Sequence, residues 1–333
     1  MIAVAERTAR TVSFLATDPV SKAQGGVTPH TVVHRQNKAC VRYFAPAEPR
    51  YAPVFVSMPL INKWTIFDLV RGRSVVGALV EAGVPIYLLD WGGAGPEDRE
   101  NTLGTYVDGV LGRAIDRACR HAGVPQMDAL GYCVGGTFLA MHLARHAGRV
   151  RRVAFLATPI DFHASGRLAR WARPDTFPLD AIVDGVGNFP RELMRTSFAW
   201  LRPMGQTGKY VGLWERIEDD GFRDLWAHME LWNNDGVDFP GETYRAYVRS
   251  CYFDNAMMNG GFALDGSPCD LGRATIPALT LAASEDHIVP PPAAFGLARV
   301  WGGPVQTDTV RGGHVGVCIG ASLPKRLLEW VRS

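Results

Sequence analysis

One short segment carries the residues best suited to covalent chemistry. Residues 131–137, GYCVGGT, place Cys133 between glycines, after a predicted strand and before a predicted helix. In such a G-x-nucleophile-x-G turn, a side chain two residues away on either side would clash. The start of the helix favours the thiolate form of Cys133, which is the attacking species in acyl transfer. No G-x-Ser-x-G competes for the role, and a buried structural cysteine is the alternative interpretation.

A carboxylate to partner this nucleophile follows a later strand. The predicted strand at residues 276–283 leads into Ser284, Glu285 and Asp286. In α/β-hydrolases the triad runs in the order nucleophile, acid, histidine, at the C-terminal ends of strands. We therefore predict Asp286 as the acid, with Glu285 as its rival.

The base follows the last predicted strand, residues 305–310, in the turn Arg311-Gly312-Gly313-His314. The two glycines leave His314 free to swing over the nucleophile, so we predict His314 as the general base. His287, next to the predicted acid, is the rival base and a secondary candidate for contact with the site.

Acyl transfer also needs an oxyanion hole. The expected donors are the backbone N–H of Val134, directly after the nucleophile, and one from the loop after the first central strand. That loop contains Leu60 and Ile61, and the sequence does not choose between them.

Short apolar runs alternate with longer amphipathic stretches, which is typical of a mostly parallel sheet with helices on both faces. An antiparallel hairpin at residues 31–34 and 40–43 is expected at one edge. The predicted strands are residues 53–57, 84–91, 127–132, 150–157, 276–283 and 305–310. The predicted helices between them are residues 68–82, 106–121, 136–146 and 293–301. We expect an α/β-hydrolase core formed by residues 1–160 and 265–333.

Residues 161–264 break the alternation. They are rich in Trp, Phe, Arg and Pro, contain no clear strand run, and have helical patches at residues 180–186, 190–201, 210–217, 224–232 and 241–255. We predict a mainly helical cap over the C-terminal edge of the sheet, where it would bury a substrate and exclude water. A purely structural helical layer is the alternative.

Composition excludes several other classes. With 47% hydrophobic residues and a net charge of +2 over 333 residues, the chain is neither disordered nor a nucleic-acid binder. Six cysteines without a CxxC pair, and a start that does not read as a secretory signal, favour a reducing cytoplasm. His142 and His146 lie four apart on a predicted helix, but without a third ligand they indicate a surface pair and no metal site.

Together these residues resemble the polyhydroxyalkanoate synthases over roughly residues 28–332. The cysteine in the lipase-like box and the turn DHIVP at residues 286–290 are the most specific matches. Further matches are TPH at 28–30, LINK at 60–63, IYLLDW at 86–91, WNND at 232–235, PG at 240–241 and NGG at 259–261. The short N-terminal part resembles the class III catalytic subunit, whereas residues 232–235 and 286–290 look closer to class I. That short start leaves little room for leading helices.

The resemblance implies an enzyme, an acyltransferase that polymerises 3-hydroxyacyl-coenzyme A into polyester and releases coenzyme A. It implies that Cys133 carries the growing chain, that His314 is the base and that Asp286 orients it or helps activate the incoming hydroxyl. No cofactor is expected, since the coenzyme A thioester is the substrate. The expected partners are a second copy of the chain, a second synthase subunit and a granule surface, with no nucleic acid and no membrane span. The alternative function is that of a thioesterase, a polyester depolymerase, or another acyltransferase or hydrolase on the same fold. The third hypothesis is a scaffold protein at a granule surface that has no catalytic activity.

Overall fold

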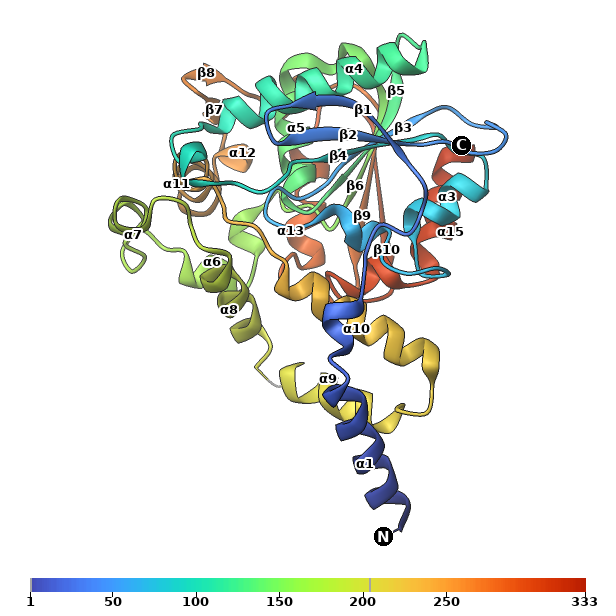
Figure 1. The fold of residues 1–333 in the computed structure, drawn as a ribbon. Coiled ribbons are helices and arrows are strands. Elements are labelled where there is room, and N and C mark those ends of the chain that lie inside the picture. Colours follow the sequence, from blue (N-terminus) through green and yellow to red (C-terminus); the bar gives the residue numbers. More distant parts are fainter. Residues whose placement is uncertain (1, 204) are drawn as a thin grey trace.

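A central sheet of eight strands organises the molecule, which we describe from a computed structural model covering residues 2–203 and 205–333 (Figure 1). The strand order is β1-β2-β4-β3-β5-β6-β9-β10, with β1–β2 and β2–β4 antiparallel and every later pairing parallel. The strands are β1 (Thr31–Gln36), β2 (Ala39–Phe44), β3 (Val54–Ser57), β4 (Ile86–Asp90), β5 (Met127–Tyr132), β6 (Val150–Leu156), β9 (Ala278–Ala283) and β10 (Val305–Val310). The predicted fold class and edge hairpin are confirmed.

Alternation along the strands gives each face of the sheet its own core. In β3, Val54 and Val56 belong to one buried cluster and Phe55, between them, to the other. Successive side chains of a strand point to opposite faces, so one four-residue strand contributes to both clusters. The first cluster includes residues of α3 and α15, and the second includes residues of α4 and α5. The core helices are α3 (Val75–Glu81), α4 (Gly112–Ala122), α5 (Val134–His146), α13 (Pro291–Phe295), α14 (Leu297–Val300) and α15 (Ser322–Arg332).

One predicted core helix is shorter than the sequence indicated, and another is divided into two. The helix expected from residue 68 begins only at α3, because Ser74 is its N-cap and accepts a hydrogen bond from the Gly77 N–H. The buried Asp68 instead accepts hydrogen bonds from Thr28 and Ser74. The helix expected at 293–301 is divided into α13 and α14 at Gly296.

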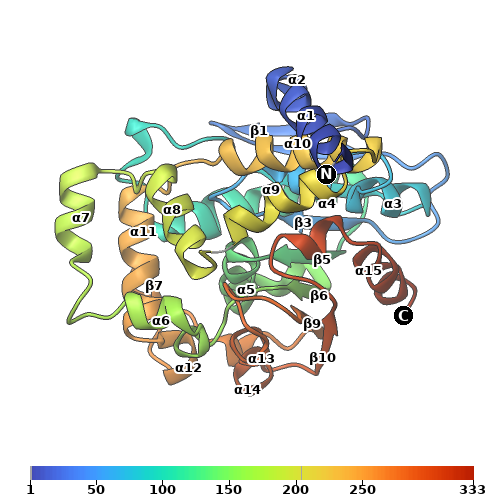
Figure 2. The same ribbon diagram turned by 90° about the horizontal axis from the view of Figure 1, so that it is seen from below.

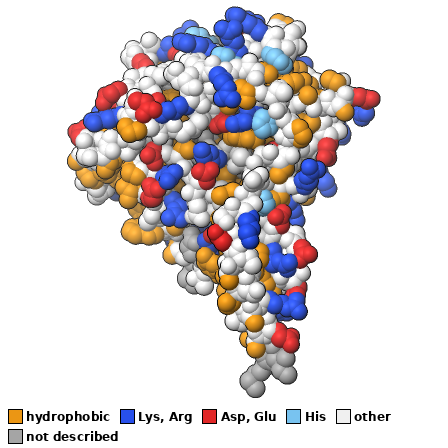
Figure 3. Space-filling view, in the orientation of Figure 1, with side chains coloured by type: hydrophobic (Ala, Val, Ile, Leu, Met, Phe, Trp, Pro, Cys, Tyr) orange, Lys and Arg blue, Asp and Glu red, His pale blue; other side chains and the backbone are white. Residues whose placement is uncertain are grey.

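The expectation that the short start leaves little room for leading helices is wrong. The chain begins with α1 (Ile2–Ala16) and α2 (Pro19–Lys22), and α1 packs against α9 (Gly205–Glu215). Together α1 and α9 project away from the sheet, with hydrophobic side chains visible on their surface (Figures 1 and 3). Arg7 of α1 lies over the ring of Trp214 of α9, 5.2 Å from its centroid. No helix in the described part of the chain is long and apolar enough to cross a membrane.

The chain between β6 and β9 is mainly helical, and its helices lie to one side of the sheet (Figure 2). Besides α9, the helices are α6 (Arg167–Trp171), α7 (Leu179–Val186), α8 (Arg191–Leu201), α10 (Asp220–Asn234), α11 (Gly241–Tyr247), the π-helix η6 (Val248–Phe253) and α12 (Ala256–Asn259). A small hairpin, β7 (Ala263–Leu264) and β8 (Ser267–Pro268), was not expected. Its turn residues Asp265 and Gly266 both have positive φ, as an Asp-Gly hairpin turn requires. The domain boundaries at residues 161 and 264 stay a prediction.

Six 3-10 helices and a second π-helix complete the described part of the chain. One of them, the π-helix η3, leads directly into α4. They are η1 (Trp64–Phe67), η2 (Pro96–Asp98), η3 (Thr105–Leu111), η4 (Ala147–Arg149), η5 (Phe162–Ala164), η7 (Leu271–Arg273) and η8 (Gly316–Ile319).

Candidate active site

Cys133 lies on the sharp turn between β5 and α5. Its φ of 52° and ψ of −133° are a conformation that residues with a side chain rarely adopt. Close packing on both sides holds the turn in place. A Cβ at Gly135 would collide with the backbone carbonyl of Met58, and one at Gly136 would collide with the side chain of Thr158. The glycines therefore let the backbone pack tightly while Cys133 is held in a strained, outward position.

The carboxylate of Asp286 is held by three hydrogen bonds. Its Oδ1 atom accepts from the backbone N–H groups of Ile288 and Val289, both at 2.8 Å. Its Oδ2 atom lies 2.6 Å from Nδ1 of His314. The side chain is fully buried. This carboxylate therefore has one oxygen fixed by the backbone and the other aimed at the imidazole.

The imidazole of His314 lies between two negative groups. Burial alone would lower its pKa, but the negative charges of a Cys133 thiolate and of Asp286 outweigh burial and raise the pKa to about 10. Tyr132 adds mechanical support, because its hydroxyl donates to the His314 carbonyl oxygen at 3.1 Å. Its ring also stacks on the imidazole, with centroids 5.5 Å apart. The arrangement thus favours the protonated form of the His314 imidazole.

The alternative acid, Glu285, and the alternative base, His287, do not reach the cavities at Cys133. Glu285 and His287 are both exposed, on either side of the buried Asp286, and neither lines a cavity that reaches Cys133. Three consecutive residues therefore point in different directions, which the sequence could not show. Asp286 and His314 are the two predicted residues that the structure brings into direct contact.

The two loop candidates for the oxyanion hole differ in position. Ile61 lines the cavities beside Cys133, and it shares the smaller one with Val134. Leu60 is buried and lines neither cavity. Of the two loop candidates, Ile61 is therefore the one that reaches the cavities beside Cys133.

Comparisons with known proteins show to which family the chain belongs. The family described as "alpha/beta hydrolase fold" matches residues 66–301. The chain is 33% identical over 309 residues to the poly(3-hydroxyalkanoate) polymerase subunit PhaC of Allochromatium vinosum, covering 91% of this chain and 86% of that protein. It is 32% identical to the protein of the same name from Thiocystis violacea, again covering 91% and 86%. The chain belongs to the poly(3-hydroxyalkanoate) polymerase family.

Solved structures agree on the fold of this polymerase-family chain. A hydrolase from Pseudomonas aeruginosa superposes with a TM-score of 0.54 at 14% identity, covering 92% of this chain and all of that one. At this identity the likeness concerns the fold alone.

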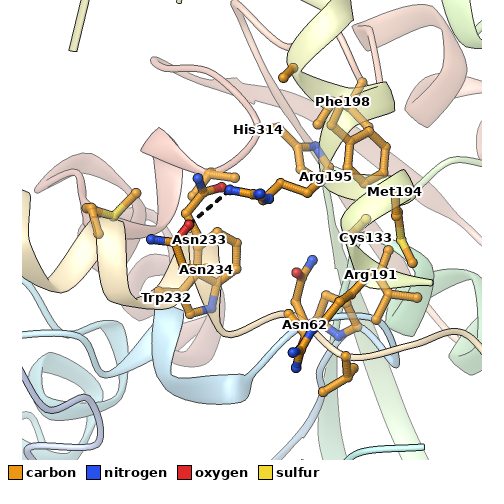
Figure 4. A pocket seen from close by; sticks show the side chains of 18 of the residues that line it. Asn62, Cys133, Arg191, Met194, Arg195, Phe198, Trp232, Asn233, Asn234 and His314 are labelled. Atoms are coloured by element: carbon orange, nitrogen blue, oxygen red, sulfur yellow. Dashed lines mark hydrogen bonds between the residues drawn. The ribbon is translucent and has the colours of Figure 1, made fainter. Parts of the chain in front are cut away.

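Two cavities meet at Cys133 in this member of the polymerase family. The larger, of about 620 Å³, also contains His314 and is lined by polar and charged residues of α8 and α10 (Figure 4). The smaller, of about 180 Å³, is almost entirely apolar. Five residues line both cavities: Ile61, Cys133, Met194, Phe198 and Ile288. The aromatic residues of the smaller cavity are Trp171, Phe177, Phe189, Phe198, Phe239, Tyr244, Tyr247 and Tyr252.

The sequence analysis missed the residues of α8 that face Cys133. Met194 and Phe198 separate the cavities, and Arg191, Arg195 and Arg202 line the larger one. A signal was present, because these arginines recur at intervals of four and seven residues, which puts them on one face of a helix.

The histidine pair of α5 is not the surface pair that was expected. His142 is buried and His146 is exposed, and Asp108 approaches both, with its Oδ1 atom 3.6 Å from His142 Nδ1 and 3.7 Å from His146 Nε2. Within residues 2–203 and 205–333, no group of three His, Cys, Asp or Glu side chains is placed to hold a metal ion.

Proposed function

We propose that this chain is an acyltransferase that polymerises 3-hydroxyacyl-coenzyme A into a polyester and releases coenzyme A. The observation that carries the proposal is the position of Cys133. It lies where a charged cavity and an apolar cavity meet, beside an imidazole held by a buried carboxylate. The family supports the reaction, since the relatives at 32–33% identity are named poly(3-hydroxyalkanoate) polymerases. The reaction as proposed needs no cofactor.

In the first step, Cys133 Sγ attacks the thioester carbonyl of the substrate. The thiol proton has passed to His314, and the developing oxyanion is stabilised by the N–H groups of Val134 and Ile61. The carbon–sulfur bond to coenzyme A breaks, and the leaving thiolate takes the proton back from His314. Asp286 keeps the imidazole oriented throughout. One thioester replaces another, so the step is nearly balanced in free energy.

In the second step, a hydroxyl group attacks the thioester on Cys133. His314 takes the hydroxyl proton and returns it to the departing Cys133 sulfur. The product is an ester, which is more stable than the thioester that it replaces, so chain growth is driven forward. Water would give hydrolysis instead, and the aromatic cavity supports the exclusion of water from the acyl group.

Hydrolysis of the same thioester is the second candidate function. The fold is shared with hydrolases, as the likeness to the Pseudomonas aeruginosa hydrolase illustrates. The choice between the two outcomes depends on which hydroxyl group reaches the thioester on Cys133 first. A thioesterase or a polyester depolymerase would use the same Cys133, His314 and Asp286.

Intact-mass spectrometry of the protein mixed with 3-hydroxybutyryl-coenzyme A tests the proposal. A ladder of repeated hydroxyacyl units on the wild type, absent from the Cys133→Ala variant, is the expected result. Coenzyme A release without a ladder would replace polymerisation by hydrolysis. A ladder that persists in Cys133→Ala would remove the cysteine from its role.

We also propose that the chain acts in the cytoplasm. There it would associate with a second copy of itself or with a second synthase subunit. Apolar side chains support it: Trp200 of α8 is 68% exposed and Val12 of α1 is 61% exposed. Analytical ultracentrifugation of the purified protein gives the test, with a dimer as the expected state and a monomer at all concentrations as the contrary result.

A further inference from the structure

The loop after β3 contains a backbone donor that is not used by the fold. Ile61 is buried and lines both cavities at Cys133. Among the hydrogen bonds of residues 2–203 and 205–333, its N–H donates to no protein acceptor. Val134 is the first residue of α5, where a helix leaves its N–H groups without partners. Two backbone donors beside Cys133 are therefore available for an oxyanion.

Hydrogen bonds from two different parts of the molecule hold this loop. At its start, the carbonyl oxygen of Met58 accepts from Nε1 of Trp91, which directly follows β4, at 2.6 Å. Near its end, the carbonyl oxygen of Lys63 accepts from Nε1 of Trp232, on α10, at 2.8 Å. The loop is therefore fixed to the core at one end and to α10 at the other.

The α10 side holds the part of the loop that contains Ile61. The Ile61 carbonyl accepts from the Val237 N–H at 3.4 Å, a longer and weaker bond than the one from Trp232. The Trp232 ring is buried in the same core cluster as Trp64, and it also lines the larger cavity (Figure 4). Because Lys63 is only two residues from Ile61, the indole of Trp232 restricts where the Ile61 N–H can point.

We infer that Trp232 is a positioning residue for the oxyanion hole. Its indole N–H holds the loop so that the Ile61 N–H is directed at the carbonyl oxygen of the substrate. The inference rests on the proposed function, in which the N–H groups of Val134 and Ile61 stabilise the oxyanion. Such donors are effective only when their positions are set before the reaction. In this role Trp232 acts through the backbone of residues 61–63.

Two reagents that react with the Cys133 sulfur separate the oxyanion hole from the thiolate. With butyraldehyde, the sulfur adds to the carbonyl carbon, the carbonyl oxygen takes the π electron pair and then a proton from His314, and a thiohemiacetal forms. Iodoacetamide alkylates the same sulfur by displacing iodide, and it places no oxyanion in the hole. The other five cysteines are buried, so alkylation reports on Cys133. A defect of the oxyanion hole should weaken aldehyde binding alone.

Trp232→Phe keeps an aromatic ring and removes the donor. The dissociation constant of butyraldehyde, measured by its protection of Cys133 from alkylation, should rise about 10-fold, in the range of one lost hydrogen bond. The alkylation rate without aldehyde should stay at the wild-type value. With 3-hydroxybutyryl-coenzyme A, kcat should fall and KM should stay the same, because the bond acts on the transition state.

β-(3-Benzothienyl)alanine in place of Trp232 keeps the size of the indole and has a sulfur atom instead of the N–H. It should weaken aldehyde binding as Trp232→Phe does. If it keeps the wild-type affinity, the packing of the ring matters and its hydrogen bond does not, and the inference is wrong.

Trp226→Phe is the matched control. Trp226 lies on the same helix and is 7% exposed, as Trp232 is, but its Nε1 atom has no hydrogen-bond partner in the described part of the chain. Its ring packs against Phe14 of α1. This variant should keep the wild-type affinity for butyraldehyde. An equal loss in Trp226→Phe and Trp232→Phe would mean that α10 is loosened as a whole, and the positioning role would be lost.

The aldehyde measurement distinguishes failure of this inference from failure of the proposed function, because it needs no polymer. Aldehyde binding that weakens in Trp232→Phe, while the wild type grows no polymer, supports the positioning role and removes polymerisation. Aldehyde binding that is the same in wild type and Trp232→Phe, while the wild type does grow polymer, overturns the positioning role and leaves the function standing.

Discussion

The core and the helical segment that faces it hold their functional residues in different ways. In the core, Asp286 is buried and fixed by two backbone N–H groups, and Cys133 lies on a turn that admits no extra atom at Gly135. On α8, Arg195 is exposed and is held by one hydrogen bond to a neutral side chain. The core is rigid by packing, and the cap side is built from long, adjustable side chains.

This difference suggests a division of labour. Acyl transfer depends on donors and bases held in advance at the positions that the transition state needs, which burial and backbone hydrogen bonds provide. Binding a long substrate depends on side chains that can follow its shape. Substitutions in the core should therefore change the chemical rate or the stability. Substitutions on α8 should change which substrate is used and how tightly it binds.

The largest effect is expected from Asp286→Asn. An amide at this position cannot hold His314 in the same tautomer or stabilise its charged form, and comparable substitutions in other triads lower kcat by about 10³- to 10⁴-fold. The measurement is kcat for coenzyme A release. Glu285→Gln, at the exposed neighbouring carboxylate, is the control and should retain wild-type activity. A strong loss in Glu285→Gln with little loss in Asp286→Asn would exchange their roles.

The next effect is on stability, from Gly135→Ala. The new Cβ would collide with the Met58 carbonyl, a backbone atom that cannot rotate away, so we expect a loss of about 1–3 kcal/mol in the free energy of unfolding. Gly185→Ala, on the cap helix α7, has open space around its Cβ and should stabilise by about 0.5–1 kcal/mol through helix propensity. Urea unfolding of both variants compares the regions directly. Equal effects would remove the contrast between rigid core and open cap.

The contrast between the core and the cap side also explains which features could be predicted from the sequence. The parallel strands and the Cys133 turn have strong local signals, namely apolar runs and glycines at fixed spacing, and each predicted strand is present with its ends within two residues. Order along the chain was enough to select Asp286 and His314. Whether Asp286 or its neighbours Glu285 and His287 point inward depends on the backbone of one turn, which no pattern of residue types encodes.

The cap side was predictable only in outline. Helical patches were visible, but which of their residues face Cys133 depends on how α8 and α10 pack over the sheet. Arg195 and Asn234 are 39 residues apart and meet through that packing. The first helix was missed for a related reason. The segment before the first strand looked too short for helices, but α1 packs against α9, where Arg7 lies over Trp214, a contact distant in sequence.

A smaller effect, confined to one range of pH, follows from His314. Its pKa is about 10 in the folded protein and 6.5 ordinarily, so protonated His314 contributes stability that is complete below about pH 6.5 and is lost as pH rises towards 10. Cys133→Ala removes the largest of the charges that raise this pKa. The free energy of unfolding should therefore fall less steeply between pH 7 and 10 in Cys133→Ala than in the wild type. Parallel curves from urea unfolding would show that Cys133 does not raise the pKa of His314.

The smallest effect is expected from Phe198→Ala, which acts on selectivity. Phe198 lines both cavities, and removing its ring would join the apolar cavity to the larger one next to Cys133. A longer acyl chain gains room while a short chain loses contacts, and pocket differences of a methylene or two change selectivity by about 10-fold. The ratio of kcat/KM for 3-hydroxyhexanoyl- to 3-hydroxybutyryl-coenzyme A should rise by about that factor. Phe14→Ala, at the contact between α1 and α10, is the control for general loosening of the helices, because Phe14 lines neither cavity at Cys133. If both variants change the ratio equally, Phe198 does not define the acyl cavity, and selectivity would have to reside in the rigid core.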